Sequence, residues 1–513
     1  MWCKYELHRT VASHGGFIAG RSKFYITTAI PYVNAAPHLG HALEFVQTDA
    51  IARYHKSLGE DVFLTTGSDE NSLKNVRAAE KLGITPALLC EKNAKMFREL
   101  AEKIELSFDS FVRSSVKEEH WKGPEMLWEL CNKSGDIYTK MYSGLYCVEC
   151  EEFYMEKELI KGLCPEHGIK PEIVEEENYF FRLSKYQKQI EELISKDELR
   201  IMPESRKSEM LTFVKEGLQD FSVSRSVKRA KGWGVPVPGD QSQIMFVWFD
   251  ALAIYLTGIG YPQNKEKFEK YWPADVHVIG KGITRFHALY WPGILMSAGL
   301  ALPKNIFIHG YITVNGQKMS KSIGNVLDPL MLIDKYGAEK LRYYLLKSIP
   351  TFEDGDFSET GLVEAINNEL VGNLGNFIHR SLTFIWNNYS GKLGVKKLEK
   401  QDEDFLQKIS TLEGEATKLL GECRLHEAML RILEIGNDAN KYFQSNAPWE
   451  LIKTDKENTE RILFVCWQAC GIIVRLLYPY TPSSSEKLLN ILGTSTTEGI
   501  AIKQPYIVFD KIK

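Results

Sequence analysis

Short apolar runs alternate with amphipathic runs in the first part of the chain. Residues 24–30 (FYITTAI) are apolar or β-branched, which predicts a buried strand, whereas residues 41–59 repeat apolar positions at helical spacing and end on a glycine. A second strand with its loop is expected over residues 61–71, and a second helix over residues 72–83. The rhythm resumes at residues 276–282. Such alternation predicts an α/β fold with a Rossmann-type, doubly wound parallel sheet.

Between the two halves of this pattern, residues 138–224 have a different texture. Charged residues, short strand-like pieces and three cysteines crowd this segment. We therefore expect an insertion that splits the sheet.

The C-terminal part is predicted to be an all-α bundle. Periodic apolar positions run through residues 404–423, 425–443 and 459–477. Before them, an apolar stripe recurs every four residues, which indicates a buried helix face. The stripe consists of Leu362, Ile366, Leu370, Leu374, Ile378 and Leu382.

These patterns divide the chain into six segments. They are an N-terminal extension (1–22), the first half of the sheet (23–137), the insertion (138–224), the second half of the sheet (225–317), a loop and connection (318–361) and the helical bundle (362–513).

Composition and charge narrow the classes of protein. The formal net charge is −4 over 513 residues, which argues against wholesale electrostatic binding of nucleic acid but permits a local basic surface. No apolar run reaches the roughly 18–20 residues of a membrane span. Nine cysteines in this length favour a reducing compartment over a disulfide scaffold, and we expect the cytoplasm. If residues 1–22 were a presequence rather than an extension, the mitochondrial matrix would be the alternative.

Two histidines stand where the first helix opens. His38 and His41 are three residues apart and share a helix face, and Gly40 between them leaves room for a flat base. A helix start offers free N–H groups to phosphate, and imidazoles there can donate as well. Two structural histidines are the alternative.

A second signal comes from the loop GYITVNGQKMSKSIGN. Lys318 and Lys321 lie in a glycine-flanked, serine-rich segment after a strand. Lysines on such a loop can close over a polyphosphate and meet the charge that develops during its reaction. A solvated lysine loop is the alternative.

The insertion carries candidate metal ligands. Cys147 and Cys150 form a CxxC pair, and Cys164 and His167 follow as CxxH. This spacing fits a tetrahedral Cys₃His zinc site, which would be structural because all four positions are filled by protein. Disulfides are the alternative.

The histidine and lysine motifs together resemble the paired signature of class I aminoacyl-tRNA synthetases. The resemblance implies adenylation of an amino acid by ATP with Mg²⁺, followed by transfer to tRNA, without a covalent enzyme intermediate. It implies that ATP is bound and activated by His38, Gly40, His41, Lys318, Lys321 and Ser322, and that Arg225 is a further catalytic residue.

The chain from residue 24 onward resembles the methionyl-tRNA synthetase family in particular. Four stretches carry this likeness: AIPYVNAAPHLGH, SDEN, VWFDALAIY and IGKGITRFHALYWP. Aromatic edges suit the polarisable sulfur of methionine. The resemblance implies a methionine pocket made of Ile30, Tyr32, Asp69, Trp248, Ala251, Leu252, Tyr255, Ile283 and His287.

The helical part would then read the anticodon of tRNA(Met). An exposed tryptophan can stack on an unpaired base, and amide and guanidinium groups can bond its edges. The matching residues are Asn376, Arg380, Pro448 and Trp449. Residues 318–361 would contact the acceptor stem. The resemblance also implies a monomer, because the chain ends soon after the bundle.

The sequence departs from the family pattern in two places. Asn71-Ser72 follow the acidic pair where His-Gly is usual, and Gly282 stands where an acid is common. Lys281 and Asp69 themselves are present, so we expect altered contacts rather than lost activity.

Related enzymes fit the sequence less well. The leucine, isoleucine and valine enzymes need a large editing insertion, because one methylene is worth only about 1–3 kcal/mol. The stretch between His41 and Lys318 has no room for one beside the metal lobe and half the sheet. The cysteine enzyme would use zinc inside its substrate pocket. A non-catalytic tRNA-binding relative predicts decay of the two signature motifs, and both are whole.

Overall fold

The computed structural model describes residues 22–314, 316–318 and 326–513. Its contacts divide the chain into two compact units. The sheet unit comprises Ser22–Thr48 and Asp61–Gly310, and the helical unit comprises Asp49–Glu60 and Tyr311–Lys513. None of the helices in these described stretches is both long and apolar enough to cross a membrane.

A six-stranded sheet in the order β3-β2-β1-β12-β13-β7 is the centre of the sheet unit. All of its neighbouring strands pair in parallel. The strands are β1 (Lys23–Thr27), β2 (Asp61–Ser68), β3 (Ser110–Arg113), β7 (Arg200–Met202), β12 (Val276–Gly280) and β13 (Asn305–His309). The expected doubly wound parallel sheet is thereby confirmed.

The central strands are buried on both faces, as parallel strands between helix layers must be. Tyr25 and Ile26 of β1 have no exposed surface, and Ile306 and Phe307 of β13 are equally buried. Strand β7 comes from inside residues 138–224, so part of the segment expected as the insertion returns to the edge of the main sheet.

Local chemistry explains where helix α2 begins and ends. The side chain of Ser72 caps α2 (Leu73–Leu82) by accepting a bond from the backbone N–H of Asn75, at 3.2 Å. Gly83 ends α2 in the left-handed region, which glycine adopts without steric cost. Helix α1 (Leu39–Ser57) begins in this unit, and its residues from Asp49 onward belong to the helical unit. The other helices are α3 (Pro86–Lys103), α4 (Lys122–Lys133), α5 (Gln187–Ser195), α6 (Glu204–Lys215), α7 (Val227–Ala230), α8 (Val247–Leu252), α9 (Ile254–Thr257), α10 (Lys265–Tyr271) and α11 (Trp291–Ala298).

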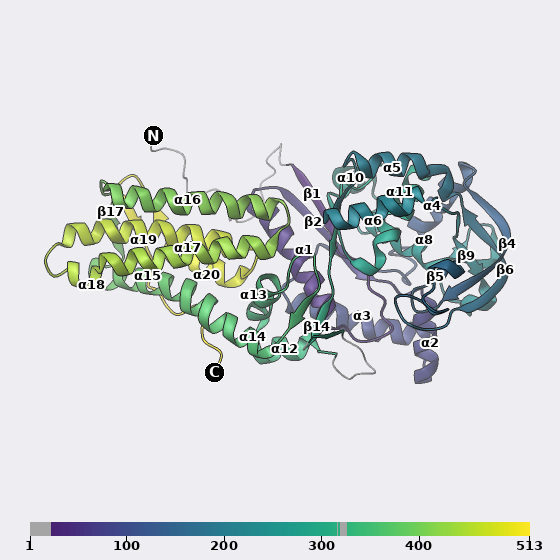
Figure 1. The fold of residues 1–513 in the computed structure, drawn as a ribbon, viewed down its shortest axis with the longest axis horizontal. Helices are drawn as coiled ribbons and strands as arrows, with labels where there is room; N and C mark the ends of the chain where they lie inside the picture. Colours follow the sequence, from purple (N-terminus) through teal and green to yellow (C-terminus); the bar gives the residue numbers. More distant parts are fainter. Residues whose placement is uncertain (1–21, 315, 319–325) are drawn as a thin grey trace. The chain divides into compact units, whose positions relative to one another are not determined.

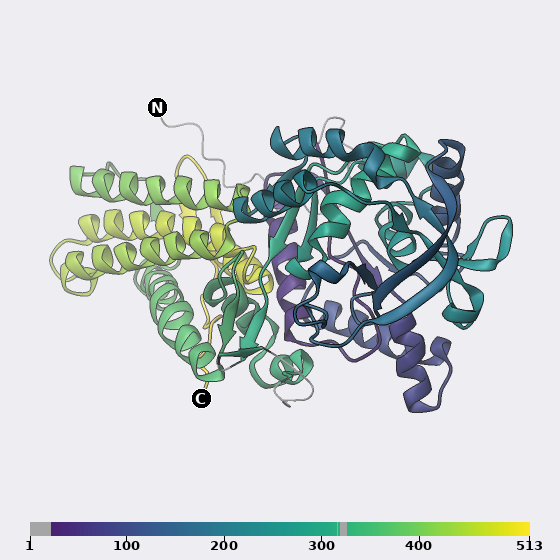
Figure 2. The ribbon, with the colours of Figure 1, turned by 45° about the vertical axis from the view of Figure 1, so that its right-hand side comes forward.

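The insertion forms its own antiparallel sheet in the order β5-β4-β6-β8. Its long pair β4 and β6 lies at the edge of the unit (Figures 1 and 2). The strands are β4 (Ile137–Cys147), β5 (Glu152–Tyr154), β6 (Glu172–Phe181) and β8 (Phe221–Ser222). A second antiparallel sheet follows, made of β9 (Ser224–Ser226), β10 (Pro236–Val237) and β11 (Asp240–Met245).

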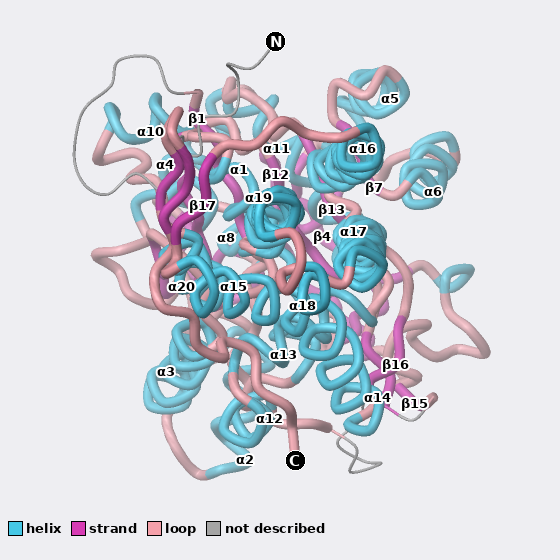
Figure 3. Tube along the Cα trace, turned by 90° about the vertical axis from the view of Figure 1, so that its left-hand side faces the viewer, coloured by secondary structure: helices cyan, strands magenta, loops and turns pink. Residues whose placement is uncertain are grey.

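The helical unit is a bundle, as the apolar periodicity predicts. Helices α16, α17 and α19 lie side by side and are seen end-on in Figure 3. The helices are α12 (Pro329–Tyr336), α13 (Ala338–Ser348), α14 (Glu359–Glu364), α15 (Asn376–Tyr389), α16 (Lys400–Gly421), α17 (Leu425–Asn446), α18 (Pro448–Leu451), α19 (Lys456–Leu477) and α20 (Pro482–Leu492). Short strands complete the unit: β14 (Ile312–Val314), β15 (Gln317–Lys318), β16 (Gly355–Phe357), β17 (Lys392–Gly394), β18 (Thr494–Ser495) and β19 (Gly499–Ala501).

The apolar stripe from Leu362 to Leu382, which recurs every four residues, has a structural explanation. Residues Ala365–Gly375 form a wide π-helical segment between α14 and α15. A π-helix closes its hydrogen bonds over five residues, so a spacing of four stays on one face better there than on an α-helix. All six residues of the stripe are buried.

Candidate active site

The candidate site lies where strand order reverses in the main sheet. Strands β1 and β12 are neighbours although most of the unit separates them in sequence. Open parallel sheets bind ligands outside the carboxyl ends of the strands at such a point. Tyr32 follows β1, Asp69 follows β2 and Ile283 follows β12, so the sequence candidates gather at this edge. Tyr32 and Asp69 also pair directly, as a backbone bridge.

The two histidines stack on each other at the start of α1. Their ring centroids are 3.9 Å apart at an interplanar angle of 25°. The Nδ1 atom of His38 accepts from the backbone N–H of Gly40, and the Nδ1 atom of His41 accepts from that of His38, both at 3.1 Å. Because each neutral ring carries one proton, Nε2 is the donor in both rings. Burial, then His38 and His309, lower the pKa of His41 well below its usual range.

Aromatic side chains cluster beside this edge, where we expect the methionine pocket. Trp248 stacks on Phe286 with centroids 3.7 Å apart, and the Tyr32 ring meets Trp248 edge-on at 6.2 Å. The hydroxyl of Tyr255 lies 2.7 Å from Nε2 of His287. Helix α8 also carries Ala251 and Leu252, and Ile30 and Ile283 pack against the core of the sheet unit.

Three polar atoms in the pocket are buried without a hydrogen-bond partner among the described residues. They are the hydroxyl of Tyr32, Oδ1 of Asp69 and Nε1 of Trp248. A buried polar group without a partner costs about 1–3 kcal/mol, and a ligand that bonded these three atoms would remove that cost. Burial, then Asp250 and Glu151, raise the pKa of Asp69 well above its usual range. A cation bound beside Asp69 would reverse that effect.

The sequence did not point to the polar network behind the pocket. Asp250 is buried and accepts from the Asn71 amide at 2.7 Å, while Nε2 of His120 lies 2.8 Å from its other oxygen. Asn71 therefore stabilises a buried carboxylate, and Ser72 caps α2, so both residues of the Asn71-Ser72 departure have structural roles.

Glu44 and His309 form a second pair that the sequence did not single out. Nε2 of His309 lies 3.1 Å from one oxygen of Glu44, whose other oxygen accepts from the backbone N–H of Ala29. His309 ends strand β13 and influences the pKa of His41. The one sequence feature that could have indicated a role for His309 is its position at the end of a predicted strand.

The lysine loop is largely outside the described residues. Lys321 and Ser322 fall in the undescribed stretch 319–325, and only the backbone of Lys318 is described, as the end of β15. Their expected roles stay predictions. Arg225 is described: it is buried in β9 and its Nη2 lies 3.1 Å from Oε2 of Glu151.

The insertion brings its four candidate ligands together. One ligand atom from each of Cys147, Cys150, Cys164 and His167 lies within 4.8 Å of all the others. Sulfur and imidazole donors at tetrahedral spacing suit a soft or borderline divalent cation. The four cysteine and histidine side chains can thus hold a metal ion. The neighbouring Cys150 thiol lowers the pKa of Cys147, which favours a thiolate ligand there.

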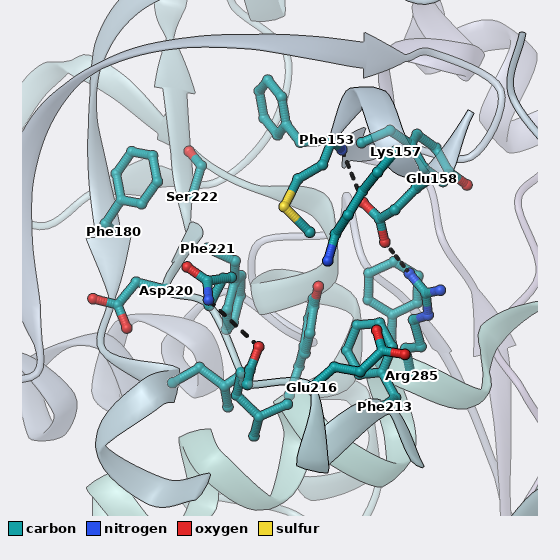
Figure 4. A pocket seen from close by; sticks show the side chains of 18 of the residues that line it. Phe153, Lys157, Glu158, Phe180, Phe213, Glu216, Asp220, Phe221, Ser222 and Arg285 are labelled. Atoms are coloured by element: carbon teal, nitrogen blue, oxygen red, sulfur yellow. Dashed lines mark hydrogen bonds and ion pairs between the residues drawn. The ribbon is translucent and has the colours of Figure 1, made fainter. Parts of the chain in front are cut away.

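A hollow of about 670 Å³ lies between the insertion sheet and helix α6. Aromatic rings line it, including Phe153, Phe213 and Phe221, and charged side chains stand among them (Figure 4). Arg285 pairs with Glu158 across 3.1 Å at this hollow.

In the helical unit, the residues expected to read the anticodon also approach one another. The guanidinium of Arg380 on α15 lies 5.7 Å from the ring centre of Trp449, which stands in the first turn of α18 after Pro448. Arg380 also lies 4.9 Å from the ring of Phe443, a neighbour that the sequence did not suggest. Asn376 is exposed at the start of α15.

Comparisons with known proteins agree with these features. Residues 24–170 and 167–382 match the family model of class I tRNA synthetases (M), and residues 394–512 match the anticodon binding domain of methionyl tRNA ligase. A methionine--tRNA ligase of Brucella melitensis is 42% identical over 478 residues, which are 92% of both chains. One from Mycobacterium tuberculosis is 40% identical over 487 residues, with 93% of both chains covered.

Solved structures show the same likeness in three dimensions. The structure of Mycobacterium tuberculosis methionyl-tRNA synthetase in complex with methionyl-adenylate has a TM-score of 0.91 and 39% identity, and covers 96% of this chain and 100% of that one. Its apo form has a TM-score of 0.84. With the site geometry, the matched domains and relatives of this identity all in agreement, this chain belongs to the methionyl-tRNA synthetase family of class I aminoacyl-tRNA synthetases.

Proposed function

We propose that this chain is a methionine--tRNA ligase that activates L-methionine with ATP and transfers it to the 3′ end of tRNA(Met). In the first step, a carboxylate oxygen of methionine bonds to the α-phosphorus of ATP, and the bond from that phosphorus to pyrophosphate breaks. The tRNA hydroxyl then displaces AMP. Support comes from the family and from a relative that was solved with methionyl-adenylate.

The buried carboxylate of Asp69 is the observation that carries the proposal. It lacks a partner for Oδ1 among the described residues and sits beside an aromatic pocket. A substrate ammonium would supply the missing bond and offset the raised pKa of this carboxyl group. The methionine side chain would then extend between Tyr32, Trp248 and His287, whose ring edges suit a thioether.

The stacked histidines supply donors for the phosphates. Nε2 of His38 and of His41 can each donate to an oxygen that gains charge in the transition state, and burial keeps His41 a neutral donor. We assign the same role to Lys318 and Lys321, because ammonium groups on a loop can approach as charge develops. Catalysis is then positioning and electrostatics, without a nucleophile on the enzyme.

Two metal ions belong to the proposal. The Cys₃His cluster would hold a structural Zn²⁺, since four protein ligands leave no open position for chemistry. Mg²⁺ would arrive with ATP as its phosphate complex. Metal analysis of the purified protein tests the first assignment, with about one zinc per chain expected.

ATP–pyrophosphate exchange with each of the twenty amino acids tests the activity. We expect exchange that depends on methionine, and a loss of about 10²–10³ in kcat for His41→Asn, the size seen when one transition-state donor is removed. Calorimetric binding of methionine should change little in that variant. Exchange driven chiefly by another amino acid would overturn the substrate assignment.

We further propose that the enzyme is a monomer that acts in the cytoplasm. The bacterial relatives support the compartment, and residues 1–21, the segment that would decide the mitochondrial alternative, lie outside the described residues. Sedimentation and cell fractionation test the two statements.

A further inference from the structure

The turn that carries the first two metal ligands also reaches the proposed methionine pocket. This cysteine turn, residues 147–151, joins β4 to β5. Its side chains face two ways. Cys147 and Cys150 belong to the cysteine–histidine cluster, whereas Val148 packs in the same buried apolar cluster as Phe246 and Trp248. The turn thus has a cluster side and a pocket side.

Glu151 is the most constrained residue of this turn. It follows Cys150 directly, has no exposed surface and adopts a φ of 54°, a left-handed conformation that is uncommon for a residue with a side chain. Such a conformation persists only where surrounding contacts impose it. Its carboxylate makes those contacts away from the metal cluster.

Each oxygen of the Glu151 carboxylate has a partner on the pocket side. Oε1 accepts from the backbone N–H of Lys74, in the first turn of α2, at 3.2 Å. Oε2 accepts from Arg225 at 3.1 Å and from the hydroxyl of Tyr146. The carboxylate therefore joins strand β9 to the start of the helix that follows Asp69.

Arg225 depends on this carboxylate for its charge balance. It is 4% exposed and its guanidinium lies 4.9 Å from the ring centre of Phe246. Among the described residues, its ion pair is with Glu151. Removing one partner of a buried pair leaves an uncompensated charge, so Arg225 could not keep this position without Glu151.

A second acid of the turn supports the same pocket. Glu149 lies 3.9 Å from Nζ of Lys74, and this ammonium lies 4.5 Å from the ring centre of Tyr32. Two carboxylates on one short turn therefore reach Tyr32 through Lys74 and Phe246 through Arg225.

We propose that Glu151 is a positioning residue for methionine activation, which holds Arg225 and the first turn of α2 in place and links the metal cluster to the methionine pocket. Since Glu151 is bonded covalently to the ligand Cys150, a metal ion that holds Cys150 also restricts the backbone of Glu151. The inference rests on the proposed function, because it assumes that the pocket binds methionine.

Glu151→Gln tests the link, since it removes the charge and keeps the shape. We expect the methionine Kd, measured by calorimetry, and the methionine KM in pyrophosphate exchange to rise about 10- to 100-fold, the range for a charge-assisted hydrogen bond. The KM for ATP should stay within about twofold and the metal content should not change. Glu166→Gln is the matched control, because Glu166 is exposed between two ligands of the same cluster.

Three outcomes would overturn the inference. The first is wild-type methionine affinity in Glu151→Gln, and the second is an equal loss for methionine and ATP together with loss of the metal, which would mean a purely structural role. The third comes from a double-mutant cycle: if the effects of Glu151→Gln and Arg225→Gln multiply as independent changes, Glu151 does not act through Arg225.

A variant that does not fold still leaves the inference testable. Glu151→Asp keeps the charge on a shorter side chain, and we expect an intermediate loss of methionine affinity from it; an unchanged Kd would contradict the proposal. If the wild-type protein itself failed to bind methionine, the proposed function would fail instead, whatever the variants do.

Discussion

His287 illustrates how burial determines the chemistry of a single side chain. Its Nδ1 lies 3.0 Å from the carbonyl oxygen of Ile283, so Nδ1 carries the proton and Nε2 accepts from Tyr255. Burial lowers the pKa of His287 to about 4. The imidazole is therefore neutral at physiological pH, and the Tyr255 hydroxyl is oriented by its donation.

This pKa predicts how stability depends on pH. Because the folded value lies below the ordinary 6.5, the unfolded chain binds more protons between about pH 6.5 and 4, and stability falls as the pH drops through that window. The contribution of His287 is about 3 kcal/mol. Urea unfolding from pH 7 to 4 should show a smaller loss for His287→Gln than for the wild type. If stability fell equally steeply with pH in the two proteins, the contribution assigned to His287 would be wrong. The other buried histidines, His41 and His277, are present in both proteins and would then account for the whole loss.

At the scale of elements, Ser72 decides where α2 begins. The family pattern has glycine here, and this chain gains a side-chain cap on the backbone N–H of Asn75. Ser72→Ala should cost about 1 kcal/mol and lower the apparent melting temperature by about 1–2 °C. Differential scanning calorimetry measures this. Ser72→Gly should lose only a few tenths of that energy, and an equal loss in both variants would argue against capping.

Helix α18 predicts a separate effect on tRNA. Trp449 stands at its first turn with one face near Arg380, and loss of base stacking costs about 1–3 kcal/mol per base. Trp449→Ala should therefore raise the KM for tRNA(Met) in aminoacylation about 10- to 100-fold. Pyrophosphate exchange without tRNA should be unchanged.

Trp386 offers a matched control for that experiment. It lies near the other end of α15, and the described contacts do not place it beside Arg380. Trp386→Ala should leave the KM for tRNA close to the wild-type value. A similar rise in both variants would mean that general destabilisation, rather than stacking, causes the effect.

At the scale of the whole molecule, a buried charge pair joins residues far apart in sequence within the helical unit. Nη2 of Arg342 on α13 donates to Asp49 at 2.6 Å, and both side chains are fully buried. Asp49→Asn should destabilise the protein by about 3–5 kcal/mol, because it leaves a buried guanidinium uncompensated. Thermal unfolding measures this.

Two further variants separate the buried pair from surface charge. Asp404→Asn breaks the exposed pair with Lys400 and should change stability by about 0–1 kcal/mol. Nε of Arg53 also donates to Asp49, at 2.6 Å, so all three charges must be replaced together: Asp49→Leu with Arg342→Met and Arg53→Met should recover most of the loss. A triple variant as unstable as Asp49→Asn would show that the charges are needed for more than their mutual balance.

Much of this architecture could be predicted because it depends on interactions between residues that are close together in the sequence. Alternation of apolar runs located the parallel sheet, the spacing of Cys147 to His167 located a cysteine–histidine cluster that can hold a metal ion, and the stripe from Leu362 located the bundle. Such signals lie in residues close together in the chain, where periodicity and turn chemistry act directly.

By itself, then, the sequence determined the fold class and the helix that begins at the histidine pair. Only the tertiary structure decided which buried groups stay neutral. It also decided that Asn71 donates a hydrogen bond to Asp250 and that Glu151 connects the cysteine turn to Arg225. The physical reason is that pKa values and buried polar bonds depend on neighbours distant in sequence, and a linear pattern does not record which distant residues become neighbours.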